Sequence, residues 1–469
     1  MALGGAWVRP SRMKLNMNGI RRTGLLLLLL SGGISIGWGS FIEHNSSATM
    51  ADFKAIYYGA RCLIHHRDPY KESEFLSVYQ AEGGEFPLDP TISKLFRRAV
   101  PICINLPTAF LIAAPFSVLG WGPAHLLWML LTAASLMLAS FLIWTLAARW
   151  SPGVSLFLIC IVLANSEILF AGGNLAGIAV GLCVLAVWCL LKDRFVLAGV
   201  LCLAVSLVIK PHDAGLVWLF FLLAGGVYRK RALQTLVVVA ALSLPAILWV
   251  SHIAPYWAQE LHSNLALTSA HGDLNDPGPA SIAFHNLNMV ISLQSAISIF
   301  RDDPSFYNPV SYLVCGALLL VWLIRTLRLR FSQTTAWFAL AAVAPLAMLP
   351  VYHREYDAKL LLLAVPACAM LWAGGGPVRW LALLLNTAAV VLTGDIPSAI
   401  LVLLTKNLHL NTAELSGKIL TVVLVRPAPI ILLALATFYL WAYLRRAHSL
   451  ALSTDTGVCE RLGFARARG

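Results

Sequence analysis

Long apolar runs separated by short polar segments fill most of this 469-residue chain. Each run should be an α-helix if it lies in lipid, because lipid offers the backbone no hydrogen-bond partners. A membrane-spanning helix needs about 20 mainly apolar residues, so the pattern predicts an all-α, polytopic membrane protein of about twelve transmembrane helices within residues 23–444. The expected spans are 23–41, 122–148, 153–171, 175–191, 195–209, 214–227, 232–250, 309–324, 334–351, 358–373, 380–393 and 419–444, with a less clear segment at 396–418.

Two longer polar loops interrupt this pattern, at about 43–105 and 253–306. Loops of more than about 15 residues are usually functional or disordered. In the first loop, the aromatic residues Phe53, Tyr57 and Tyr58 favour short interfacial helices that lie on the membrane surface. The apolar piece that follows is short and contains Pro115, so we expect a re-entrant or interfacial segment there.

Composition supports a membrane protein. The chain is 59% hydrophobic and 12% charged, whereas a soluble domain carries about 25% charged residues. The net charge of +12 does not indicate nucleic acid, because the basic residues form short clusters between apolar runs. That distribution follows the positive-inside rule of membrane proteins. The expected partner of the chain's surface is therefore a lipid bilayer, and no nucleic acid is expected.

The basic clusters also predict an orientation. We assign the basic segments 1–22 and 445–469 to the cytoplasm. The first apolar run could be a cleaved signal peptide, but Gly-Trp-Gly at 37–39 is a poor cleavage site, so we expect a retained anchor. Every even-numbered span then ends in basic residues, at Arg149, Lys192 and Arg194, 229–231, 325–330, Arg379, and Arg445 and Arg446.

The unusual polar residues collect at the odd-numbered ends, on the outer face. We therefore expect a multi-pass protein of the plasma membrane, in a bacterial inner membrane, with its active site facing outward. Glu167 is an exception, because it lies inside the third expected span. An acid at that depth either belongs to a proton pathway or pairs with an internal polar side chain.

Asp52 is the first candidate for a chemical role. The pattern Thr49-x-x-Asp52 is that of a capping box, in which the carboxylate stabilises a helix N-terminus. A carboxylate held in this way can also act as a general base. The sequence alone leaves both interpretations open, and the two roles are compatible.

The residues that follow Asp52 have two interpretations as well. Tyr57 and Arg61 are four residues apart, so they share one face of a helix. They are either part of an amphipathic interfacial helix or part of a surface that binds a sugar or a lipid headgroup. The same alternatives apply to the further candidates for substrate binding in this stretch, which are Tyr58, Asp68 and Tyr70.

Two polar clusters end apolar runs on the predicted outer face. Lys210-Pro211-His212 places a lysine against the charge rule, either as a snorkelling side chain or as a paired or phosphate-binding one. Residues 353–357 have the sequence His-Arg-Glu-Tyr-Asp. They are either the salt-bridged start of a helix or a functional cluster. In the second reading, His353 relays a proton or donates to a phosphate, and Arg354 grips the phosphate.

The sequence contains no phosphate-cradling glycine loop and no metal-ligand spacing, so we expect no cofactor and no metal. His65, His66 and Asp68 are an alternative as metal ligands. The nine cysteines are scattered, and we expect them to be buried thiols. Cys62 and Cys103 could instead form a disulfide within one outer loop.

Several segments together resemble glycosyltransferase family 87, a family of the GT-C class of membrane sugar transferases. The segments are ADFKAIYYGARCLIHHRDPY at 51–70, the piece at 107–115, GNLAGIAVGLCVLAVWCLLKDRFVLAGVLCLAVSLVIKP at 173–211, and HREYDAKLLLLAVP at 353–366. The sequence departs from the family pattern at Asn174, where glutamine is usual, and at Gly177, where an asparagine is expected. The resemblance covers about residues 25–370.

The resemblance implies an inverting hexosyltransferase. The donor would be a polyprenyl-phosphate sugar, expected to carry mannose, and the acceptor a glycolipid or glycan. Asp52 would be the general base, with His353 as a second catalytic residue, and Lys210, Arg354 and His212 would bind the donor phosphate. The expected substrate-binding residues are Tyr57, Tyr58, Arg61, Asp68, Tyr70, Asn174, Glu355 and Asp357.

Two other functions remain open at this point. A secondary transporter would place Lys210 and Glu167 on a substrate pathway at mid-membrane. It would have little use for the long loop at 43–105. An enzyme like an O-antigen ligase or polymerase would carry its essential charges on the loop at 253–306 instead of at Asp52.

Overall fold

Helices form the regular structure of this protein. The computed structural model describes residues 17–46, 49–283, 290–328, 331–405 and 413–463, and in these residues it contains no β-strand beyond one antiparallel bridge between Val290 and Arg354. The predicted all-α fold is therefore confirmed. Most of the basic segment 1–22 lies outside the described residues.

Seven helical segments in the described residues are long and apolar enough to cross a membrane, and one bent pair makes a possible eighth. The seven are Arg21–His44, Trp121–Ala147, Pro152–Ala171, Gly226–Ile253, Pro304–Arg328, Glu355–Ala373 and Pro427–Arg445, and the pair is Val378–Leu392 with Asp395–Leu401, bent by 71°. The protein is thus a multi-pass membrane protein. The expected number of about twelve spans stays a prediction, because six further apolar helices have only 10–17 residues.

The longer helices are α1 (Met17–His44), α6 (Trp121–Ala147), α7 (Pro152–Ala164), α9 (Ala176–Lys192), α10 (Val196–Ile209), α11 (Pro211–Leu223), α12 (Gly226–Ile253), α15 (Pro304–Arg328), α16 (Gln333–Met348), α18 (Val378–Leu392) and α21 (Pro427–Gly463). The shorter ones are α8 (Glu167–Ala171), α13 (Trp257–Thr268), α14 (Leu293–Ile297), α17 (Val365–Ala373), α19 (Asp395–Thr405), α20 (Leu415–Val425) and the 3₁₀ helix η1 (Glu355–Ala364).

The loop at 43–105 contains three of the short helices that the sequence predicted, α2 (Ala51–Ile64), α3 (Glu72–Ala81) and α4 (Pro90–Ala99). With α5 (Pro107–Ser117) they enclose a core of their own, in which the rings of Phe53 and Trp128 stack 4.6 Å apart. This core explains why so many aromatic residues occur in a polar loop. Whether these helices lie on a membrane surface stays a prediction.

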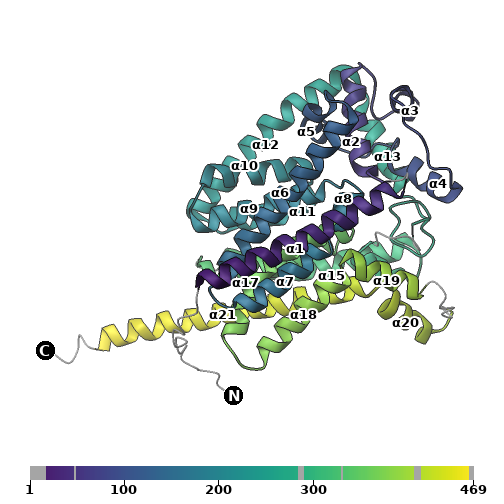
Figure 1. Ribbon diagram of the computed structural model, residues 1–469. Helices are drawn as coiled ribbons and strands as arrows, with labels where there is room; N and C mark the ends of the chain where they lie inside the picture. The colour runs from purple at the N-terminus through teal and green to yellow at the C-terminus, as the bar shows by residue number, and fades with distance from the viewer. Residues whose placement is uncertain (1–16, 47–48, 284–289, 329–330, 406–412, 464–469) are drawn as a thin grey trace.

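The polar segments gather at one end of the bundle. In Figure 1, α2, α3, α4, α13, α19 and α20 lie toward one side, and the labelled chain ends lie toward the other. We call the first side the Asp52 end. The helix α16 and the helix η1 run through the middle, and nearly all their side chains are buried. A helix that is apolar on nearly all sides, as α16 is, belongs in such a position.

One expected span is wrong. The sequence predicted a single helix at 419–444, but α20 ends at Val425 and α21 begins at Pro427. Proline has no N–H to donate, so it starts a helix well and interrupts one badly. The side chain of Arg426, between the two helices, is buried near Glu355.

A buried ion pair holds two irregular segments together. Lys359 on η1 donates to Asp395 at 3.1 Å and to the carbonyl of Asn165 at 2.5 Å, where α7 and α8 are separated. The other oxygen of Asp395 accepts the N–H of Ile168 at 2.9 Å. The Lys359–Asp395 ion pair therefore joins the break between α7 and α8 to the bend between α18 and α19.

We predict that Lys359→Met lowers the free energy of unfolding by about 3–5 kcal/mol, because it leaves the buried Asp395 carboxylate without its cation. Thermal or denaturant unfolding in detergent measures this loss. The double variant Lys359→Met with Asp395→Asn should recover most of it, since the asparagine oxygen still accepts from Ile168. Equal losses in the single and double variants would contradict the ion-pair interpretation.

Candidate functional site

The start of α2 is fixed by the loop between α8 and α9. The N–H of Met50 donates to the carbonyl of Ala171 at 2.7 Å, and the N–H of Asp52 donates to that of Gly172 at 3.1 Å. Gly173 follows with a φ of +65°, and a Cβ atom there would come within 2.7 Å of the Cβ of Phe53. A glycine is therefore required where the loop passes α2.

The Asp52 carboxylate has one defined side-chain partner. Asn174 Nδ2 donates to Asp52 Oδ2 at 2.8 Å. The amide oxygen of Asn174 accepts the N–H of Ala176 at 2.8 Å, which directs the amide nitrogen toward Asp52. One of the two residues at which the sequence departs from the resembled pattern is thus the one that contacts Asp52.

Burial raises the pKa of the Asp52 carboxyl above its ordinary value. The hydrogen bond from Asn174 and the positive charges of Arg354 and Lys210 oppose this rise without cancelling it. An elevated pKa makes a carboxylate a stronger base. Asp52 therefore combines a fixed direction with enhanced basicity.

The capping box expected at Thr49 and Asp52 is wrong. Met50 is the residue that precedes α2, and the helix start has no side-chain cap within the described residues. The Thr49 hydroxyl instead donates to the carbonyl of Ser46 at 2.8 Å. Asp52 is held by Asn174 and by its own backbone, because the α8–α9 loop occupies the position next to the helix N-terminus.

Lys210 lies at the junction of α10 and α11 and points inward. Its ammonium forms an ion pair with Asp357, lies 3.6 Å from Asp213, and sits 4.7 Å from the ring centre of Tyr356. Burial lowers the pKa of Lys210, but the two carboxylates outweigh burial and raise it above the ordinary value. Lys210 therefore stays charged, and it does not snorkel to the membrane surface.

Arg354 approaches from the segment before η1. Its N–H donates to Asp357 Oδ2 at 3.0 Å, so the same carboxylate contacts both Lys210 and the backbone of Arg354. The Arg354 guanidinium contacts the hydroxyl of Tyr352 and donates to the carbonyl of Leu274 at 3.0 Å. The structure thus brings two permanent cations toward Asp52 from two separate segments.

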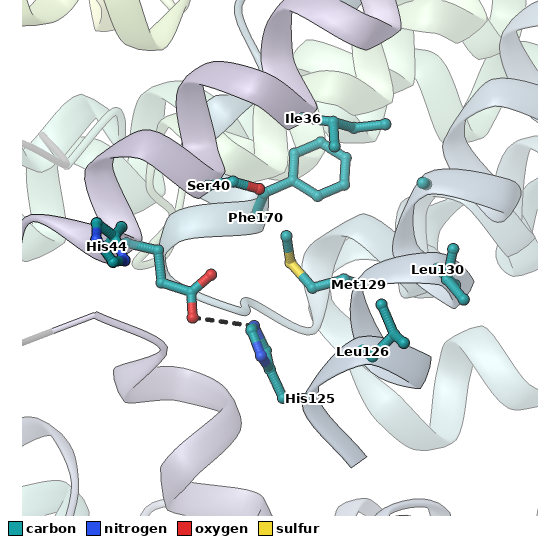
Figure 2. Close-up of a pocket in the computed structure, with 10 residues that line it drawn as sticks. Ile36, Ser40, His44, His125, Leu126, Met129, Leu130 and Phe170 are labelled. Carbon is teal, nitrogen blue, oxygen red and sulfur yellow. Dashed lines mark ion pairs between the residues drawn. The ribbon is translucent and has the colours of Figure 1, made fainter. Parts of the chain in front are cut away.

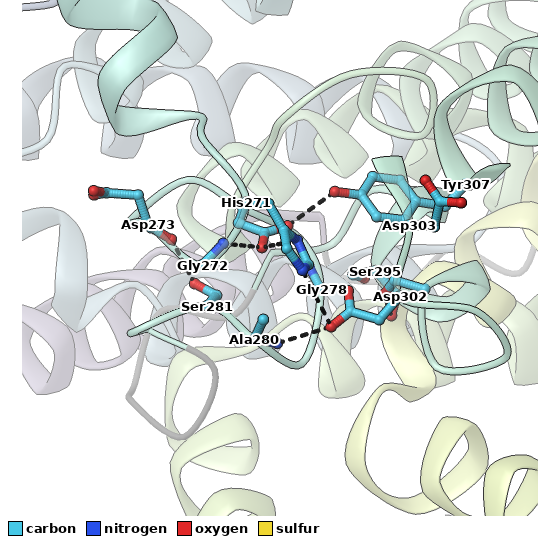
Figure 3. A network of polar contacts seen from close by, with 12 residues as sticks. His271, Gly272, Asp273, Gly278, Ala280, Ser281, Ser295, Asp302, Asp303 and Tyr307 are labelled. Atoms are coloured by element: carbon cyan, nitrogen blue, oxygen red, sulfur yellow. Dashed lines mark hydrogen bonds and ion pairs between the residues drawn. The ribbon is translucent and has the colours of Figure 1, made fainter. Parts of the chain in front are cut away.

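The carbonyl of Leu274 belongs to a loop that folds around Asp276. The Asp276 carboxylate accepts from the N–H groups of Gly272 at 2.6 Å and Gly278 at 2.9 Å and from the Tyr307 hydroxyl at 3.0 Å, and it lies 3.0 Å from His271. Figure 3 labels these four partners. This network lies in the predicted polar loop at 253–306. It holds the loop where Leu274 reaches Arg354.

His353 is fully buried, behind Lys210. Its Nδ1 lies 3.1 Å from the carbonyl of Val351, and its Nε2 lies 3.3 Å from Asp213 Oδ1. The His212 ring centre is 4.8 Å from that of His353. Sequence reasoning missed Asp213, although an acid at the third position after Lys210, at a helix start, was a usable signal.

The remaining candidates have structural partners. The hydroxyls of Tyr57 and Tyr70 donate to the carbonyls of Leu119 and Asn105, both at 2.9 Å. The Tyr58 ring packs against Tyr79 and Trp121. Arg61 forms an ion pair with Glu82 and donates to the carbonyl of Ser117. Asp68 accepts from the N–H of Tyr70, and Glu355 accepts from the Ser398 hydroxyl. Their expected role in substrate binding stays a prediction.

The sequence left the partners of Cys62, Cys103 and Glu167 open. Cys62 and Cys103 are buried and free, so they do not form the disulfide considered above. Glu167 is buried close to the charges of Asp395 and Lys359. Within the described part of the chain no ion pair joins Glu167 to either residue, and its role in a proton pathway stays untested.

A cavity of about 440 Å³ opens between α1, α6 and α8. Figure 2 shows its apolar side chains, which include Ile36, Met129 and Phe170. An ion pair between Glu43 and His125, at 3.0 Å, closes one end. Phe170 precedes by two residues the Gly172 carbonyl that holds Asp52, so α8 lines the cavity and leads directly into the loop that holds Asp52.

Comparison with known proteins gives one match. The sequence model of glycosyltransferase family 87 matches residues 104–351, which is just over half of the chain. The matched range contains Asn174, Lys210 and Asp213, whereas Asp52 and Arg354 lie outside it. No curated protein and no solved structure gives a significant match.

We predict that Gly173→Ala lowers the free energy of unfolding by about 1–3 kcal/mol, because the new methyl group strains a left-handed backbone and collides with Phe53. Thermal unfolding in detergent measures the loss. Gly153→Ala is the control, since a Cβ atom there would meet no atom within 4 Å. If both variants unfold like the wild type, the close approach at Gly173 has been overestimated.

Proposed function

The chain belongs to glycosyltransferase family 87, and we propose that it transfers a hexose, expected to be mannose, from a polyprenyl-phosphate sugar to a glycolipid or glycan hydroxyl. One observation carries the proposal. Asp52 accepts a hydrogen bond from Asn174 and lies within the electrostatic reach of Lys210 and Arg354, so a base and two phosphate-binding cations share one site. The family also disfavours the transporter considered from the sequence.

In the proposed reaction Asp52 is the general base. Its carboxylate takes the proton of the acceptor hydroxyl while that oxygen attacks the anomeric carbon of the donor. The bond between the anomeric carbon and the phosphate oxygen breaks, and the sugar is inverted at that carbon. The raised pKa of Asp52 supports this role, because a base works best with a pKa near the operating pH.

Lys210 and Arg354 stabilise the leaving phosphate, whose negative charge grows as the bond breaks. Asp357 positions both, since it pairs with the Lys210 ammonium and accepts the Arg354 N–H. His212 is the half-exposed neighbour of this pair, and His353 is the buried one, which lies against Asp213.

A lipid-linked donor or acceptor suits the position of the site. The apolar cavity between α1 and α6 offers space for part of a lipid chain, next to the loop that holds Asp52. We place the Asp52 end on the outer face of the plasma membrane, because basic residues such as Arg149 and Lys192 follow the opposite helix ends. The shorter apolar helices would then complete about twelve spans.

The α2–α5 assembly would form the acceptor side of the site. Because Tyr57, Arg61 and Tyr70 donate to protein carbonyls, they would shape this side by fixing its helices. The remaining predicted contacts, Tyr58, Asp68 and Glu355, would act in the same way, whereas Asn174 and Asp357 face the reacting groups through Asp52 and Lys210.

The test is transfer by purified protein from a panel of polyprenyl-phosphate sugars to glycolipid acceptors. We predict that Asp52→Asn abolishes transfer, a loss of at least about 10³-fold, since the amide cannot take the proton. The variant should stay folded and inserted in the membrane. Asp193→Asn makes the same change after the last residue of α9, at the far end of that helix from Asn174, and it is the matched control that should retain transfer. Full activity of Asp52→Asn would disprove the assignment of the base.

A second prediction concerns pH. Transfer needs ionised Asp52, so it should fall as the pH drops through the raised pKa of that carboxyl. Asn174→Ala removes a hydrogen bond that favours the charged form, so the pKa should rise further. The acidic limb of the pH–rate profile should therefore move to higher pH, with activity partly recovered at alkaline pH.

The control for this prediction is Asn308→Ala, which removes an amide that accepts from Gln294 on α14. Its acidic limb should coincide with that of the wild type. An acidic limb that stays in place, or moves to lower pH, in Asn174→Ala would show that Asp52 is not the group being titrated.

A further inference from the structure

Four side chains that can ligate a metal meet beside Lys210. His212 and Asp213 come from the first turn of α11, and His353 and Asp357 come from the segment that leads into η1. One ligand atom from each lies within 4.8 Å of the others. Three of the four residues are buried. The set was not evident from the sequence, because two pairs of residues some 140 positions apart supply it.

Asp213 is the least satisfied group of the set. It is 0% exposed, and neither carboxylate oxygen accepts a hydrogen bond within the described part of the chain. Its nearest charged atoms are His353 Nε2 at 3.3 Å, Lys210 Nζ at 3.6 Å and His212 Nε2 at 3.9 Å. These distances exceed the usual length of a hydrogen bond to a charged group, about 2.7–2.9 Å. A buried carboxylate is normally satisfied more fully.

The orientation of His353 also suits a metal. Its Nδ1 is 3.1 Å from the carbonyl of Val351, a contact that places the proton on Nδ1. Nε2 then faces Asp213 and has no hydrogen bond of its own among the described residues. Metal-binding histidines commonly donate one ring N–H to a carbonyl and direct the other nitrogen to the ion.

A second His/Asp cluster in the described residues provides an internal comparison. His271, Asp276 and Asp302 also lie close together, in the network of Figure 3. There the buried Asp276 accepts from two backbone N–H groups and from Tyr307, so protein donors satisfy it without an ion. At Asp213 such donors are missing from the described surroundings.

The charges of Asp213, Asp357 and Lys210 also favour a bound cation. With neutral imidazoles, Asp213 and Asp357 carry two negative charges and Lys210 one positive charge. Asp357 already contacts Lys210 and Arg354, but a carboxylate has about four acceptor positions and can take a further cation. Among the charged groups within 4 Å of these two carboxylates, one negative charge therefore remains unbalanced, and an incoming phosphate would add another.

We propose that His212, Asp213, His353 and Asp357 bind one divalent cation. Two imidazole nitrogens and two carboxylate oxygens suit Zn²⁺ or Mn²⁺. Binding of the ion does not depend on the transfer reaction. Its role does rest on the proposed function, because the cation would lie beside Lys210 and help to hold the donor phosphate.

The first test measures metal in the full-length protein, purified in detergent without chelator. We expect about one divalent ion per chain by elemental analysis. After removal of the ion with a chelator, added Mn²⁺ should bind and show nitrogen couplings from histidine in its electron paramagnetic resonance spectrum. A folded wild-type chain that holds no stoichiometric ion and takes up no Mn²⁺ would overturn the proposal, and would leave an Asp213–imidazolium pair as the explanation.

Variants locate the ion. Asp213→Asn and His353→Gln should each lose it, whereas His271→Gln, in the satisfied cluster, should keep it. If all three lose the ion equally, or all three keep it, the site is elsewhere and the proposal fails. Should a variant not fold, the nitrogen couplings of wild-type protein with and without ¹⁵N-labelled histidine decide whether histidine ligates Mn²⁺, and their absence would count against the site.

The two proposals can fail separately. Undiminished sugar transfer by metal-free protein, together with no ion in the untreated protein, would remove the cation and leave the transferase. An ion that is lost in Asp213→Asn, in a protein that transfers sugar from no polyprenyl-phosphate donor, would keep the cation and remove the proposed reaction.

Discussion

The ion pair between Lys210 and Asp357 is the contact on which the site depends. Lys210 follows α10 and Asp357 lies in the first turn of η1, so the pair joins two parts of the chain 147 residues apart. Asp357 also accepts the N–H of Arg354, and both cations act on Asp52. Breaking a buried pair leaves a charge without compensation, at a cost of about 3–5 kcal/mol. The positions of the two cations are therefore coupled through one carboxylate.

Asp52 is positioned by a different device, which is mainly backbone. The α8–α9 loop supplies carbonyls to Met50 and Asp52 and an amide to the Asp52 side chain. The apolar segment at 152–171 is interrupted before α8, and the α8–α9 loop begins after α8 with Gly172 and Gly173. Irregular backbone at membrane depth is tolerated only where protein or a polar cavity satisfies it. The breaks in the helices are thus the places where polar chemistry can be built.

The Asp52 end is held together by charged and polar contacts between distant loops. Leu274, in the loop folded around Asp276, accepts from Arg354, and Ile291 donates to the carbonyl of His353 at 2.9 Å. On the other side of η1, Lys359 joins Asp395 to the break between α7 and α8. Each of these contacts satisfies a buried group, so together they hold in place the short segment 353–359 that carries most of the site's charges.

The amino-acid sequence by itself determined the all-α membrane architecture, the short helices at 43–105 and the polar clusters at the ends of apolar runs. These features depend on local period, on the length of apolar runs and on proline, all of which act over a few residues. The motifs near Asp52, Lys210 and residue 353 were visible for the same reason, and of the three only Lys210 lies within the range of the family match.

Only the tertiary structure decided what those side chains contact. In place of the expected cap, Asp52 accepts a hydrogen bond from Asn174. Tyr57 and Arg61 donate to protein carbonyls, and the expected last span is interrupted at Arg426. The tertiary structure also placed Asp213, which no motif had marked, at the centre of the charged group. The physical reason is that a buried charge takes its partner from whichever segment packs against it, and those segments lie more than a hundred residues apart along the chain.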